Sequence, residues 1–114
     1  MVTTGRRTTI RAGREVDYET VHARIPDPVA AALRGAGVIR WTIWRDGPHL
    51  FHAVDTVAGY PAMLARLKTY GPLDPAWDEL IASMLEPGEG CDVILPVVWT
   101  MDESSQYVPA PEPR

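Results

Sequence analysis

The sequence has little cysteine, little positive charge and no long apolar run. Its 114 residues include one cysteine, Cys91, which excludes an internal disulfide, and that cysteine with three histidines offers no zinc-finger spacing. We therefore expect no structural metal, and a reducing compartment, the cytoplasm. No apolar segment has the length of a membrane span, and the basic Arg6 and Arg7 precede no apolar stretch. Neither a membrane partner nor a secretory signal is expected.

The charge balance argues against a nucleic-acid partner. Lysine and arginine total 11 against 15 aspartates and glutamates, which gives a formal net charge of −4. A surface that binds nucleic acid needs clustered basic side chains, and the acidic background leaves no such cluster. Small-molecule chemistry or contact with another protein remains, and the chain is long enough for one domain with its own core.

Hydrophobic spacing and turn residues predict alternating strands and helices. The apolar stripe of the first helix is interrupted at Pro26 and Pro28, because proline removes a backbone donor and clashes with the preceding turn. The predicted strands cover residues 7–12, 38–45, 49–54 and 91–101, and the predicted helices cover residues 14–33, 61–68 and 75–85. Residues 102–114 are polar and rich in proline, so we expect a flexible tail after a single domain of residues 1–101.

This order of elements predicts an α+β fold. It is the split βαβ pattern of ferredoxin-like βαββαβ folds, with a four-stranded antiparallel sheet and the helices on one face. The second and third strands carry apolar residues on both faces, as Trp41 and Trp44 illustrate. Because the helices cover one face only, we expect a homodimer in which two sheets face each other, a dimeric α/β barrel.

Two polar rings fall on the apolar stripe of the first helix. Tyr18 and His22 share the helical spacing of Val21 and Ile25 and therefore point inward. In one interpretation they are core residues whose polar atoms bond a backbone carbonyl or an ordered water, as most inward histidines do. In the other, two titratable groups one turn apart converge on a small ligand. The spacing alone leaves both interpretations open.

The pattern Tyr18-x-x-x-His22, the strand at residues 37–44 and the later Trp77 together resemble the L-rhamnose mutarotase family, over roughly residues 7–100. The resemblance implies a dimeric α/β barrel of ferredoxin-like subunits. It also implies an isomerase that interconverts the α and β anomers of L-rhamnose or a related deoxyhexose without a cofactor.

The same resemblance implies roles for individual residues. His22 corresponds to the family's proton donor and Tyr18 to a sugar-binding residue. Trp41 stands where the family has a strand aromatic, usually tyrosine, and Trp77 keeps one of a pair of tryptophans. The family's glutamate after the histidine is missing here or shifted to Asp27.

Elementary chemistry agrees with these roles. Mutarotation needs a base that takes the proton of the anomeric hydroxyl and an acid that protonates the ring oxygen, and a histidine that titrates near neutrality serves either role. Tryptophan rings stack on the apolar face of a sugar. His52, outside the family pattern, would be a second acid or base if it faces the helices and a packing residue if it faces the dimer partner, and strand parity alone does not decide this.

Two other functions stay open. One is a dimeric barrel that binds a small ligand without catalysis, and the other is a cofactor-independent monooxygenase-type enzyme, since one scaffold hosts unrelated chemistries. A sugar needs convergent donors and acceptors beside an aromatic ring, whereas a monooxygenase substrate needs mainly apolar walls. Tyr18 and His22, together with Asp27 or His52, favour the sugar.

Overall fold

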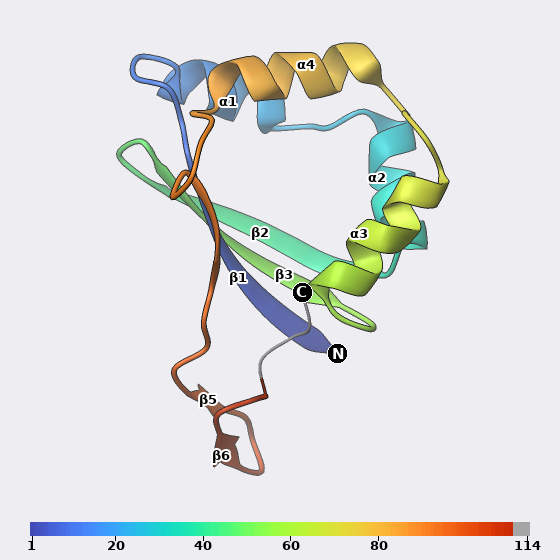
Figure 1. The fold of residues 1–114 in the computed structure, drawn as a ribbon, viewed down its shortest axis with the longest axis vertical. Coiled ribbons are helices and arrows are strands. Elements are labelled where there is room, and N and C mark those ends of the chain that lie inside the picture. The colour runs from blue at the N-terminus through green and yellow to red at the C-terminus, as the bar shows by residue number, and fades with distance from the viewer. Residues whose placement is uncertain (111–114) are drawn as a thin grey trace.

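The computed structural model describes residues 1–110 and has the predicted ferredoxin-like α+β fold. The main sheet has the strand order β2-β3-β1-β4 with antiparallel neighbours, and the helices lie on one side of it (Figure 1). The elements are β1 (Val2–Thr9), α1 (Glu15–His22), α2 (Asp27–Gly35), β2 (Val38–Asp46), β3 (His49–Thr56), α3 (Tyr60–Thr69), α4 (Pro75–Met84), β4 (Asp92–Leu95), β5 (Thr100–Met101) and β6 (Gln106–Tyr107). Within the described residues, none of the helices has the length and apolar character needed to cross a membrane.

The first strand begins earlier than its sequence predicted. We expected residues 7–12, whereas β1 covers Val2–Thr9 and Ile10 makes only an isolated bridge to Leu85. The partner strand explains the difference, because Val2 pairs with Thr56, the last residue of β3, and Thr9 pairs with His49, its first residue. Pairing with β3 on one edge and β4 on the other therefore sets these bounds, and local β propensity does not.

The interrupted helix is two separate helices. α1 ends at His22 and α2 begins at Asp27, and α1 packs beside α4 while α2 packs beside α3 (Figure 1). Asp74 caps α4, since its carboxylate accepts a hydrogen bond of 3.0 Å from the backbone N–H of Trp77. At the start of α2, Pro26 occupies the N-cap position and Asp27 lies within the first turn.

The last predicted strand divides at Pro96. β4 ends at Leu95, since proline has no backbone N–H to donate to a ladder. Farther on, β5 pairs with β6 in a separate hairpin, which extends away from the helices (Figure 1). Part of the segment predicted as a flexible tail thus forms the strand β6. In the turn before it, the Asp102 carboxylate accepts hydrogen bonds from the backbone N–H groups of Ser104 and Ser105. Residues 111–114 lie outside the described part of the chain.

The core consists of two apolar clusters on the helix-facing side of the sheet. Their buried members are Ile10, Tyr18, Leu50 and Met84 near α1 and α4, and Ala36, Val54, Tyr60 and Met63 near α2 and α3. Between them, one row of directly paired residues crosses the sheet through Arg6, His52 and Ile43. Two polar side chains of this row, Arg6 and His52, therefore lie between the two clusters on the central strands β1 and β3.

Candidate active site

Three rings from the helices form a cluster at one end of the molecule. Tyr18 stacks on His22 with ring centroids 5.1 Å apart and 18° between the ring planes. The His22 ring also lies 5.8 Å from the ring of Trp77, tilted by 48°. Tyr18 is buried and His22 is half-buried. Because α1 packs beside α4, residues more than fifty positions apart meet, and the predicted site residues of both helices come together.

The sheet contributes a second cluster. The Trp41 indole Nε1–H donates a hydrogen bond of 3.1 Å to His52 Nδ1, and His52 Nε2 lies 2.9 Å from the Thr8 hydroxyl. The Trp41 ring also meets the ring of Tyr60 edge-on, at 6.1 Å between centroids. His52, whose orientation its sequence left open, therefore faces the helices and is buried.

The charged side chain of Arg6 acts on both groups of rings. Arg6 is the direct cross-strand neighbour of His52, and two of its nitrogens donate to the two carboxylate oxygens of Asp92 at 2.7 Å each. Its charge acts on Tyr18 from one cluster and on Tyr60 and His52 from the other. Sequence reasoning missed Arg6 because it began the first strand at residue 7. With the observed bounds, the alternation of buried Thr4 and Thr8 places Arg6 on the same face.

Burial keeps the ionisable rings of the site uncharged at neutral pH. Desolvation lowers the pKa of His22, against a smaller opposing effect of a backbone hydrogen bond. Desolvation and then the charge of Arg6 lower the pKa of His52 to about 4. The pKa values of Tyr18 and Tyr60 are raised by burial, although Arg6 opposes the rise. Both imidazoles are thus neutral, with one donor and one acceptor nitrogen each, and both phenols keep their protons.

A hollow of about 220 Å³ borders the helical cluster. Tyr18 and His22 line it from α1, and β2 and β3 supply the opposite wall. Its lining residues are Tyr18, Glu19, His22, Ala23, Ile43, Trp44, Arg45 and Leu50. A small ligand in this hollow would therefore reach the His22 ring directly.

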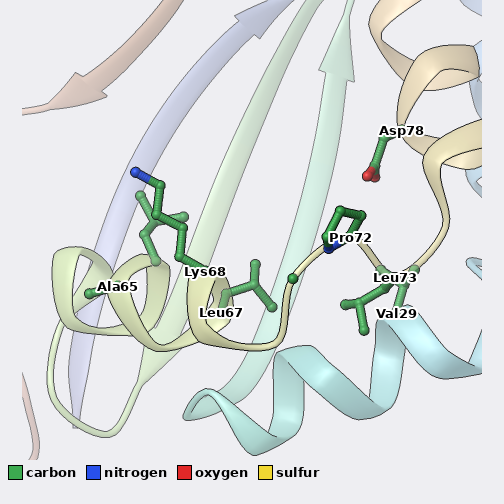
Figure 2. A pocket seen from close by; sticks show the side chains of 9 residues that line it. Val29, Ala65, Leu67, Lys68, Pro72, Leu73 and Asp78 are labelled. Carbon is green, nitrogen blue, oxygen red and sulfur yellow. The ribbon is translucent and has the colours of Figure 1, made fainter.

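A larger hollow of about 570 Å³ lies between α2, α3 and α4 (Figure 2). Most of its wall is apolar, with Val29 from α2 and Leu67 from α3, and the charged Lys68 and Asp78 are its polar members. None of the stacked rings lines this hollow. Tyr18 and His22 therefore border the smaller hollow, and His52 lines neither of the two.

Asp27 is the predicted site residue that lies apart from the rings. Its carboxylate pairs with Arg24 at 2.8 Å, and its side chain is 80% exposed. Within residues 1–110, no three histidine, cysteine, aspartate or glutamate side chains gather closely enough to hold a metal ion. Tyr18 and His22 offer uncharged donors and acceptors beside aromatic rings, and the charged Glu19 and Arg45 of the hollow pair with each other at 2.5 Å. Such an arrangement suits a neutral polyhydroxylated ligand.

The chain is similar to one known family and to several solved structures. The family model described as L-rhamnose mutarotase matches residues 4–104, whereas a comparison with the curated proteins finds no match. An L-rhamnose mutarotase from Formosa agariphila is 14% identical and aligns with a TM-score of 0.66 over 90% of this chain and 100% of its own.

Two further structures share the fold. The tetracenomycin F2 cyclase of Streptomyces glaucescens, a type-II polyketide cyclase, is 14% identical over 100% of this chain and 98% of its own, with a TM-score of 0.56. A NIPSNAP-family protein from Agrobacterium tumefaciens is 18% identical over 82% of this chain and 89% of its own, with a TM-score of 0.50. At such identities the three structures show a common fold alone.

Proposed function

Because the chain belongs to the L-rhamnose mutarotase family, we propose that it interconverts the α and β anomers of L-rhamnose or a related deoxyhexose. The observation that carries the proposal is the neutral His22 ring, held between Tyr18 and Trp77 at the edge of a hollow. The proposed reaction uses no metal and no nucleotide, and its proposed place is the cytoplasm, in keeping with the free Cys91.

In the proposed reaction His22 moves the protons. One imidazole nitrogen of neutral His22 accepts the proton of the anomeric hydroxyl, and the imidazolium that forms gives this proton to the ring oxygen as the bond between C1 and that oxygen breaks. Rotation about the bond between C1 and C2 and reclosure then give the other anomer. A pKa below the ordinary histidine value keeps the accepting nitrogen free at pH 7. Tyr18, protonated because burial raises its pKa, would donate a hydrogen bond to a sugar hydroxyl.

Aromatic side chains would hold the sugar in place. Trp77 lies beside His22, and Trp41 projects from β2 on the same side of the sheet. The apolar face of a deoxyhexose, including its methyl group, stacks on such rings. The polar groups around them favour a sugar over the apolar substrate of a monooxygenase-type enzyme.

Anomer exchange measured by saturation-transfer proton NMR tests this function. L-rhamnose, L-fucose and D-glucose at anomeric equilibrium are compared with wild-type protein and the His22→Ala variant. We expect exchange faster than in buffer for one sugar and a loss of at least about 100-fold in the variant, the usual contribution of an acid–base residue. The matched control is His49→Ala, which removes an exposed histidine at the start of β3.

Two results would contradict the function. A folded His22→Ala protein that keeps its rate would remove His22 from the chemistry. No acceleration for any of the sugars would favour a ligand-binding barrel without catalysis.

We also propose that the protein is a homodimer joined through the open face of the sheet. On that face Trp44 and Phe51 are directly paired across strands and are 57% and 36% exposed. Val98 and Trp99, between β4 and β5, add exposed apolar surface. Two such faces in contact would bury apolar surface that is solvent-exposed in the single chain. Light scattering after gel filtration should give twice the chain mass of 12.6 kDa for wild type and a smaller mass for Trp44→Glu.

A further inference from the structure

One hydrogen bond fixes both the indole of Trp41 and the proton of His52. The indole nitrogen is a donor only, so the His52 Nδ1 that lies 3.1 Å away must accept and carries no proton. A neutral imidazole then carries its single proton on Nε2, which lies 2.9 Å from the Thr8 hydroxyl and donates to it. Two hydrogen bonds, called the relay below, therefore connect Trp41 to His52 and His52 to Thr8 across three adjacent strands.

The surroundings of His52 keep it in this form. The residue is 6% exposed, and Arg6 and Ile43 are its direct neighbours on the two flanking strands. A positive charge on His52 would lie beside the guanidinium of Arg6 and would also break the bond from Trp41. Asp92 opposes this effect but is itself engaged by Arg6, and burial remains the largest influence on the pKa of His52.

We propose that His52 is a positioning residue that orients the Trp41 indole, and that it is not a second acid or base. Without this bond the indole N–H would lose its partner, and the ring would be free to change its side-chain torsion. Tyr60 meets the same ring edge-on, and the bond to His52 fixes the direction in which the indole N–H points. The role in sugar binding rests on the proposed function, whereas the bond and the tautomer do not.

Two variants separate the halves of the relay. In His52→Asn the side-chain oxygen comes near the position of Nδ1 and can still accept from Trp41. In His52→Gln the polar end comes near the position of Nε2 and can still bond Thr8, but the indole loses its acceptor. Nitrogen-15 NMR of the tryptophan indoles, with the signal assigned by Trp41→Phe, should show the Trp41 N–H displaced upfield in His52→Gln and little changed in His52→Asn.

KM and kcat should also differ between the two variants. The Trp41 indole would contact the sugar equally in the ground state and the transition state. An indole without a fixed orientation should therefore raise KM and leave kcat nearly unchanged. For His52→Gln we expect KM to rise about fivefold with kcat within about twofold of wild type. His52→Asn should remain near wild type in both constants.

Each outcome decides the proposal. An unchanged Trp41 signal in His52→Gln, or a proton on Nδ1 of wild-type His52, would overturn it. So would a fall in kcat in both variants as large as that of His22→Ala, because that result would make His52 an acid or base. If wild type accelerates no sugar, the proposed function fails, and the indole and imidazole signals still establish or refute the positioning role.

Discussion

Acidification from pH 7 to pH 5 should destabilise this protein through His52. The pKa of His52 is about 4 in the folded chain because of burial and the charge of Arg6, against about 6.5 when the chain is unfolded. Between these values only the unfolded state takes up the proton, so stability is present above pH 6.5 and falls as the pH falls toward 4. From the two pKa values, the loss between pH 7 and pH 5 is about 2 kcal/mol.

Urea unfolding of wild type and His52→Asn at the two pH values isolates this contribution. The variant lacks the titrating ring, so its free energy of unfolding should fall by about 2 kcal/mol less than that of wild type over the same interval. His22 titrates in both proteins, and its contribution cancels in the comparison. Asp92, whose pKa Arg6 holds below the usual range, stays ionised at pH 5. Both proteins are measured at one concentration, since association would add to the apparent stability.

The reasoning fails if wild type and variant lose equal stability between pH 7 and pH 5. Protons would then reach His52 in the folded chain as readily as in the unfolded one. Its bond with Trp41 would not exclude the charged form.

Three further predictions concern the core, the exposed carboxylate and the rate profile. Met84, the last residue of α4, is fully buried, so Met84→Ala should lower the free energy of unfolding by about 2–5 kcal/mol in urea titrations. Leu64→Ala, at an exposed position of α3, should cost much less. Asp27→Ala should leave the rate of anomer exchange unchanged by NMR, because this carboxylate pairs with Arg24 in solvent; a large loss would place it in the site. The acidic limb of kcat/KM against pH should have its midpoint below the ordinary histidine value of about 6.5, since burial lowers the pKa of His22; a midpoint above that value would contradict the assignment.

The sequence was most informative where one local rule acts alone. The spacing of Tyr18 and His22 on one helical face, and the Asp74-Pro75 start of α4, depend on neighbouring residues only, and the structure agrees with both. The bounds of β1 depend on where β3 ends, and no local pattern contains that information. Long-range pairing therefore accounts for the error in the first strand and for the omission of Arg6.

The orientation of His52 shows the same limit within the site. Side chains alternate along a strand, so a shift of one residue in register exchanges the two faces. Once the register pairs His52 with both Arg6 and Ile43, its face, its burial and its bond to Trp41 follow. The resemblance of the sequence to a family identified His22 and Trp41 as site residues. It could not show that His52 bonds both Trp41 and Thr8.

The place of His22 on α1 has a consequence for its charged form. His22 is the last residue of this helix, where backbone carbonyls without helical partners form the negative end of the helix dipole. A positive charge near such an end is favoured by about 0.3–1 kcal/mol. Burial thus keeps the ring neutral in the free protein, and in the proposed reaction the helix end would stabilise the short-lived imidazolium. His22 would thus be a neutral base before the reaction and a stabilised cation during it.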